Sequence, residues 1–143
     1  MHLDNLGIGG LVAFALAWVL AHVVKVAIVA VKNKRLGVEE LKHLIKSGGM
    51  PSAHTATMTA LATYFGILYG FDSGMFALSA AVLLIVAYDA MNVRKAVGEY
   101  GELLRKAEKN LKIVRGHTLA EVIVGAVVGI VVGQAVALMF AVV

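Results

Sequence analysis

The chain has 143 residues with a formal net charge of +4; 60% of its residues are hydrophobic and none is a cysteine. Its mean hydropathy is +0.86, and its apolar content exceeds the roughly one half that is usual in soluble domains. Composition therefore excludes an ordinary soluble domain, a disulfide framework and a thiolate metal site. We predict an all-α integral membrane bundle of four transmembrane helices, forming a single domain over residues 1–143.

The first span is predicted over about residues 6–31, more than the about 20 apolar residues that cross a bilayer. It is far longer than the core of a signal peptide, so we expect it to be retained. Lys25 lies about two turns before its end, and Lys32 follows on the same face. Charges in a membrane are costly and often functional. Snorkelling of either lysine to the interface is the simpler alternative.

The second span is predicted over residues 53–69. It is preceded by the sequence Ser47-Gly48-Gly49-Met50-Pro51-Ser52-Ala53-His54. Glycines such as Gly49 allow a tight turn, Pro51 suits a first helical turn, and a helix start attracts anions. Ser52 can donate a hydrogen bond to a bound oxyanion and His54 can carry a proton at neutral pH. A plain capped helix after a flexible loop is the alternative.

The third span, predicted over residues 75–91, delivers Asp89, Arg94 and Lys95 to the polar face. Asp89 and Arg94 are five residues apart, so on an α-helix they point about 140° away from each other. We therefore expect that they do not neutralise each other and that Asp89 pairs with Lys25 across helices. A structural ion pair explains Asp89 as well as a catalytic role does.

The fourth span is predicted over residues 118–143. His117 and Glu121 stand at positions i and i+4 at its start, so Glu121 can fix the histidine tautomer and leave the other ring nitrogen free to attack. An ordinary helix-start hydrogen bond is the alternative. Further along, small residues recur every fourth position at Gly125, Gly129 and Gly133. This ridge predicts close packing inside the bundle or, alternatively, a homodimer.

Two polar connections are predicted on one face of the membrane. Residues 37–46 read as an amphipathic turn or two, and residues 97–114 as a surface helix beneath the bilayer; solvated connectors are the simpler alternative. Every basic residue lies between Lys25 and Arg115, and the opposite face has no lysine or arginine. The positive-inside rule then places the basic face in the cytoplasm, in a protein of the cell membrane.

Four spans bring the chemically active residues to the basic face. They are Lys25, Ser52, His54, Arg94, His117 and Glu121. Cations that hold a phosphate, one histidine that attacks and another that protonates the leaving oxygen are the groups that phosphoester cleavage needs. This chemistry requires no metal and no cofactor, and we expect no nucleic-acid partner. An ion or proton translocator is a weaker interpretation, since the polar groups lie at one face.

Three segments carry a resemblance to a known family. Pro51-Ser52-Ala53-His54 resembles the P-S-G-H element of the type 2 phosphatidic acid phosphatase (PAP2) and vanadium haloperoxidase superfamily, and His117-x-x-x-Glu121 resembles its H-x-x-x-D element. With the segment from Tyr88 to Arg94, they are most similar to its divergent branch, the DUF212 or YuiD-like membrane proteins. That superfamily usually has six spans, so the resemblance implies a PAP2-like core formed by the last four.

The resemblance also implies roles. Lys25, with Lys32 or with Lys34 and Arg35, would bind phosphate together with Ser52 and Arg94; His54 would protonate the leaving group, and His117, oriented by Glu121, would be the nucleophile. Asp89, Lys95 and Gly49 are supporting candidates. The chain departs from the pattern at Ala53 and Glu121 and in the longer separation of Arg94 from His117.

Together these features predict a metal-independent lipid-phosphate phosphatase that acts through a phosphohistidine at His117, with a lipid phosphate in the basic pocket and its tail in the bilayer. The alternative is a catalytically inactive lipid-phosphate-binding protein or membrane scaffold. Two histidines in opposite protonation states predict a bell-shaped dependence of rate on pH.

Overall fold

The computed structural model describes residues 3–34, 37, 48–105, 107, 113 and 115–142. In these residues the regular elements are all helices, which confirms the all-α prediction. They are α1 (Leu3–Asn33), α3 (Ala53–Tyr69), α4 (Gly74–Tyr88), the π-helical turn η2 (Asp89–Val93), α5 (Arg94–Leu104) and α6 (Leu119–Ala141). The predicted amphipathic connector over residues 37–46 lies outside the described residues except for residue 37.

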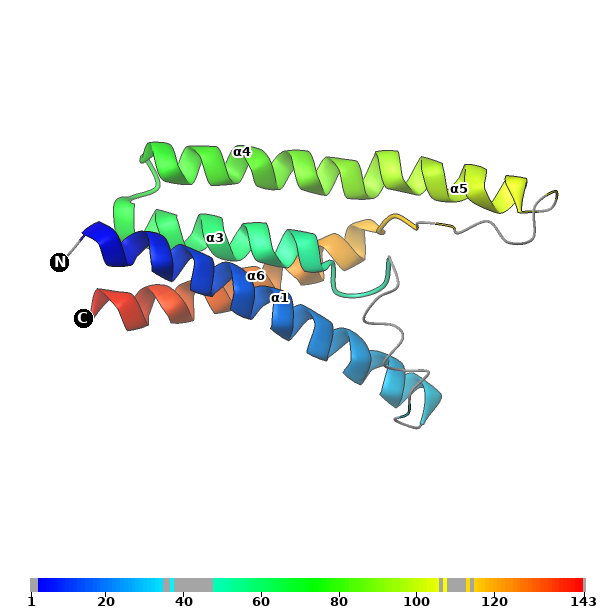
Figure 1. Cartoon of the computed structure of the whole chain (residues 1–143), viewed down its shortest axis with the longest axis horizontal. Helices are drawn as coiled ribbons and strands as arrows, with labels where there is room; N and C mark the ends of the chain where they lie inside the picture. The colour runs from blue at the N-terminus through cyan, green and yellow to red at the C-terminus, as the bar shows by residue number, and fades with distance from the viewer. Residues whose placement is uncertain are drawn as a thin grey trace.

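Helix α3 is the centre of the bundle (Figure 1). It packs against α1, α4 and α6, and α1 also packs against α6. Its interior positions are mostly small or hydroxyl-bearing, so the neighbouring helices approach it closely. Four of them are buried alanines: Ala53, Ala56, Ala60 and Ala62. The central helix is thus the one most enclosed by protein.

The glycine ridge of α6 lies directly on the backbone of α3. A Cβ atom at Gly125 would lie 2.5 Å from the Ser52 carbonyl oxygen, and one at Gly129 would lie 2.4 Å from that of Ala56. A Cβ at Gly133 would lie 2.5 Å from the Ala60 carbonyl oxygen. The ridge is therefore used inside the chain, and the alternative of a homodimer through these glycines is wrong, because α3 already covers them.

The half of the bundle that contains both termini has an apolar core around Tyr64. Its ring meets those of Phe65 and Phe140 edge to face, at centroid distances of 5.5 and 6.0 Å. Ala13 and Ala17 of α1 are fully buried in the same cluster. The packing of this half therefore consists of regular helices that meet through small residues and aromatic rings.

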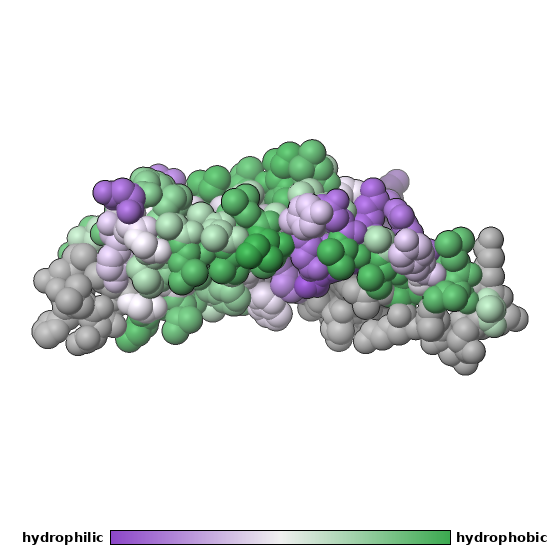
Figure 2. All heavy atoms as spheres, turned by 90° about the horizontal axis from the view of Figure 1, so that it is seen from above, coloured by the Kyte–Doolittle hydropathy of each residue, from purple (hydrophilic) through white to green (hydrophobic). Residues whose placement is uncertain are grey.

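In the part of the chain that the structure describes, three helices are long and apolar enough to cross a membrane: Gly7–Asn33, Gly74–Leu104 and Leu119–Ala141. They correspond to the first, third and fourth predicted spans. The second is observed as α3, over the predicted residues, but with 17 residues it is the shortest of the four. Large apolar side chains such as Leu11, Leu84 and Ile123 are exposed on the outside. Figure 2 shows apolar side chains over much of one face, with the largest group of polar side chains in one region and a smaller one near the opposite end.

The helix that contains the third predicted span does not end at residue 91. Helix α4, η2 and α5 follow one another without a break, and Figure 1 shows α5 continuing along the direction of α4. The helical run therefore continues past residue 91 to Leu104, and the surface helix predicted from residue 97 begins as part of this run instead of separately. Where the membrane ends along the run stays a prediction. The backbone N–H of Arg94 donates to the Asp89 carbonyl oxygen, so π-type hydrogen bonding replaces a helix end.

Candidate functional site

The loop before α3 turns through two glycines in left-handed backbone conformations, Gly48 at φ 80° and Gly49 at φ 85°. The tight turn predicted for this loop is therefore observed. Helix α3 begins at Ala53 with Ser52 as its N-cap, so Pro51 precedes the cap. The prediction that Pro51 lies in the first helical turn is wrong.

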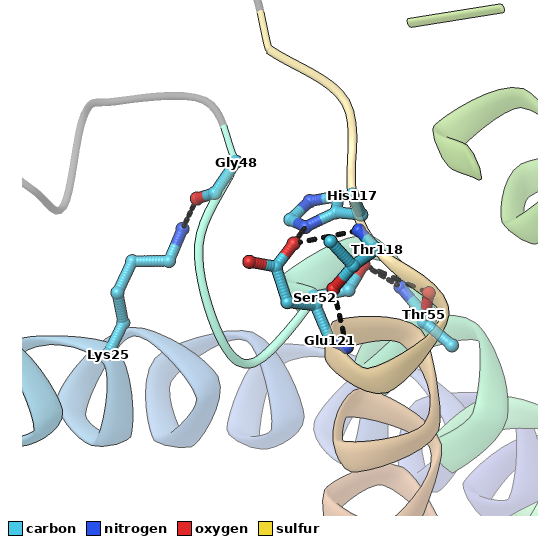
Figure 3. A network of polar contacts seen from close by, with 7 residues as sticks. All are labelled: Lys25, Gly48, Ser52, Thr55, His117, Thr118 and Glu121. Atoms are coloured by element: carbon cyan, nitrogen blue, oxygen red, sulfur yellow. Dashed lines mark hydrogen bonds and ion pairs between the residues drawn. The ribbon is translucent and has the colours of Figure 1, made fainter. Parts of the chain in front are cut away.

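Ser52 is fully buried and its hydroxyl oxygen is used within the protein. It accepts hydrogen bonds from the Thr55 backbone N–H at 3.4 Å and from the Thr55 hydroxyl at 2.9 Å (Figure 3). The capped-helix interpretation is confirmed, while a phosphate contact by Ser52 stays a prediction. The Ser52 backbone N–H also donates to the Glu121 carbonyl oxygen at 3.0 Å, which ties the start of α3 to the first turn of α6.

His117 and Glu121 form the predicted pair, with Nδ1 and Oε2 3.0 Å apart. The His117 side chain is only 8% exposed. Glu121 also closes a capping box, since its Oε2 accepts from the Thr118 backbone N–H and its own N–H donates to the Thr118 hydroxyl. The orienting and helix-start interpretations therefore hold together: one carboxylate caps α6 and holds the imidazole, leaving Nε2 outside this contact (Figure 3).

The π turn brings together Asp89 and Arg94, two residues that α-helical spacing predicts to point apart. Arg94 Nε donates to Asp89 Oδ2 in an ion pair, so the predictions that these residues do not neutralise each other and that Asp89 pairs with Lys25 are wrong. The reason is geometric: an i to i+5 backbone pattern stacks the sixth residue over the first, whereas an α-helix turns it away.

The segment before α6 lies against this π turn. The His117 backbone N–H donates to the Ala90 carbonyl oxygen at 2.9 Å. A Cβ atom at Gly116 would lie 2.4 Å from the Lys95 backbone nitrogen and 2.7 Å from the Ala90 carbonyl oxygen. Only glycine allows this approach, so the start of α6 is held against the end of α4.

Lys25 is buried in the bundle, with 7% of its surface exposed. Its Nζ donates to the Gly48 carbonyl oxygen at 2.9 Å (Figure 3), and Glu121 acts on it electrostatically. The amine is thus turned inward to the loop before α3 instead of snorkelling outward. Gly49 lies beside it, since a Cβ there would be 3.7 Å from Lys25 Cε.

His54 is exposed near the start of α3. The charges of Arg94, His117, Lys25 and His22 lie close enough to act on it. The structure thus brings the predicted histidines and two of the predicted cations together. Two other predicted residues, Lys32 and Lys95, are exposed; Lys32 lies on the part of α1 that diverges from the other helices (Figure 1).

His22 is the residue that the sequence analysis missed. Its Nδ1 donates to the Trp18 carbonyl oxygen at 2.8 Å and its ring lies 4.2 Å from the Trp18 ring. The signal was present: an ionisable residue inside a span, three positions before Lys25 and therefore on nearly the same helical face. Among the described residues no group of three or more His, Cys, Asp or Glu side chains is placed to hold a metal; that no metal takes part stays a prediction.

A helical bundle with long apolar helices and a cluster of histidines and cations at the start of its central helix defines a membrane protein with a candidate anion site. The chain matches the model of the divergent PAP2 family, DUF212, over residues 9–132 and belongs to that family. It is 32% identical over 136 residues to the uncharacterized membrane protein YuiD of Bacillus subtilis (strain 168), covering 80% of this chain and 84% of the relative. No solved structure matches it. The family resemblance is confirmed.

Proposed function

We propose that the chain is a membrane-embedded lipid-phosphate phosphatase that acts through a phosphohistidine on His117. The observation that carries this proposal is the sheltered His117–Glu121 pair. The Nδ1 atom of His117 lies 3.0 Å from the Glu121 carboxylate. The charges of His117, Arg94 and Lys25 all act on His54. A nucleophile oriented by a carboxylate, in a site that also contains cations, suits attack on a phosphate ester.

The proposed reaction has two steps. His117 Nε2 attacks phosphorus, the bond from phosphorus to the lipid oxygen breaks, and His54 gives its proton to that oxygen. Water then attacks the phosphohistidine, the P–N bond breaks, and His54 takes the water proton as phosphate leaves. Lys25 and Arg94 stabilise the negative charge on the phosphoryl oxygens in both steps.

The proposed topology has four crossings in one domain of the cell membrane, with the basic face in the cytoplasm. Helix α3, with 17 residues, is about 26 Å long at 1.5 Å per residue, close to the about 30 Å hydrocarbon thickness. Its enclosure by α1, α4 and α6 supports a short central span. A lipid phosphate would place its headgroup at the start of α3 and its tail along the exposed apolar helices.

The decisive test is phosphate release from phosphatidate and polyprenyl phosphates by detergent-purified protein, without added metal, beside His117→Ala. We expect turnover in the wild type and a loss of at least about 10³-fold in the variant. The rate should also be bell-shaped in pH, since His117 must be neutral while His54 is protonated. A flat profile between about pH 5 and 8 contradicts the two-histidine scheme.

The second candidate function is a catalytically inactive lipid-phosphate binder or scaffold. One observation favours it: the Ser52 hydroxyl, which the resemblance assigns to phosphate, is fully buried in the α3 cap. A binder keeps its affinity for lipid phosphate in His117→Ala and loses it in Lys25→Met. An enzyme loses turnover in the first variant whatever its affinity, so the two variants separate the functions.

A further inference from the structure

The π turn Asp89–Val93 interrupts an otherwise regular apolar helix without a proline or glycine. A π turn adds one residue to a helix, so every later residue is rotated by about 100° from its place in an uninterrupted α-helix. This rotation brings Arg94 over Asp89, where the ion pair forms. In a regular helix Arg94 would point away from that carboxylate.

The same turn also anchors the nucleophile's segment. The Ala90 carbonyl oxygen, inside the π turn, accepts from the His117 backbone N–H at 2.9 Å. Gly116 makes this contact feasible, because a Cβ there would lie 2.4 Å from the Lys95 nitrogen. The direction of Arg94 and the position of His117 thus depend on one five-residue element, η2, between α4 and α5.

We infer that the π turn is the positioning element of the site, which holds the phosphate-binding Arg94 and the nucleophile His117 in fixed relation, with Asp89 and Gly116 as its positioning residues. This inference rests on the proposed function. Asp89 acts through Arg94, and Gly116 acts through the backbone of His117. An anion at the site then meets a preformed pair, which is what precise attack geometry requires.

The first test is the Gly116→Ala variant, with Gly7→Ala as the matched control because a Cβ at Gly7 meets nothing within 4 Å. Hydrogen exchange of residues 115–118 and the affinity for inorganic phosphate are measured in detergent for both variants and the wild type. We expect Gly116→Ala alone to lose amide protection and to weaken phosphate binding at least tenfold. Unchanged protection, or lost protection with unchanged affinity, overturns the inference.

The second test compares Asp89→Asn with Asp89→Glu. Asparagine keeps the size of the side chain and removes its charge, whereas glutamate keeps the charge. We expect Asp89→Asn to raise KM for a lipid phosphate, or the Kd for inorganic phosphate, about tenfold, with Asp89→Glu recovering part of the loss. Equal constants in the wild type and Asp89→Asn overturn the positioning role, since a merely structural carboxylate would change only the stability.

The proposed function and the inference fail in different ways. If the wild type binds inorganic phosphate but cleaves no lipid phosphate, the phosphatase is wrong, and the π turn is still judged by the affinities of the variants. If the wild type cleaves lipid phosphate, and Gly116→Ala and Asp89→Asn match its constants for phosphate and lipid phosphate, the inference alone is wrong. If the wild type neither binds nor cleaves, both are wrong.

Discussion

The two ends of the bundle are built on different principles. In the half around Tyr64, regular helices meet through buried alanines and aromatic edges. At the other end, most groups of the candidate site lie where helical regularity stops: two left-handed glycines, the Ser52 cap, the capping box of α6 and the π turn. Lys25, inside α1, is an exception. The candidate site is thus concentrated where the backbone departs from the regular α-helix.

The regular half is nevertheless part of how the site is assembled. Glycines on α6 meet α3 carbonyls spaced by four residues, and the first of these contacts is Gly125 on Ser52. The register that packs the bundle therefore also sets the Ser52 N–H to Glu121 carbonyl hydrogen bond at 3.0 Å. A change in the ridge should reach the site, whereas a change in the site should leave the ridge intact.

The largest effect in this comparison is expected at Glu121. Glutamine can still accept the capping hydrogen bond but has no charge to stabilise the positive charge that develops on the His117 ring when Nε2 attacks phosphorus. We expect Glu121→Gln to lower kcat by on the order of 10²-fold to 10⁴-fold with little change in thermal stability. Glu121→Ala should add a loss of about 1 kcal/mol from the broken cap. Equal kcat values in Glu121→Gln and the wild type would mean that this carboxylate acts only as a helix cap.

A smaller effect, on stability, is expected at the ridge. A Cβ at Gly129 would lie 2.4 Å from the Ala56 carbonyl oxygen and 2.6 Å from Thr59 Cβ, so Gly129→Ala must separate α6 from α3. Overpacking of this kind costs about 1 to 3 kcal/mol. Thermal unfolding in detergent checks this, with Gly74→Ala as the control because nothing lies within 4 Å of its added Cβ. Matching melting temperatures for the two variants would refute the close packing.

Local spacing in the sequence predicts some of these features well. Apolar length indicates the long helices, and the i to i+4 spacing correctly predicts the His117–Glu121 contact. Two of the errors, the helix end at residue 91 and the separation of Asp89 from Arg94, arise because the predictions assume that a helix continues or ends in the regular way. No residue type in Asp89–Val93 indicates a π turn, so the Asp89–Arg94 pair was not predictable from α-helical geometry.

Tertiary contacts set the rest of the site. The partner of Lys25 is a backbone carbonyl, at Gly48, which any residue type could supply, so the sequence holds no signal for that choice. Whether the glycine ridge meets its own chain or a copy is likewise decided by which helices lie beside it. His22 is different, because its position one turn before Lys25 could have been recognised from the sequence.

The smallest effect is expected at Tyr64. Replacing it by phenylalanine tests whether the regular half contains a functional group. Its side chain is fully buried and its hydroxyl oxygen is without a hydrogen-bond partner among the described residues. Removing a buried polar group that has no partner is close to neutral or stabilising, because its desolvation cost disappears with it. Tyr64→Phe should therefore leave turnover unchanged and shift the free energy of unfolding by about 0 to +1 kcal/mol toward greater stability. A clear loss of stability or activity would mean that this hydroxyl has a bound partner and that the division between a passive half and an active half is drawn in the wrong place.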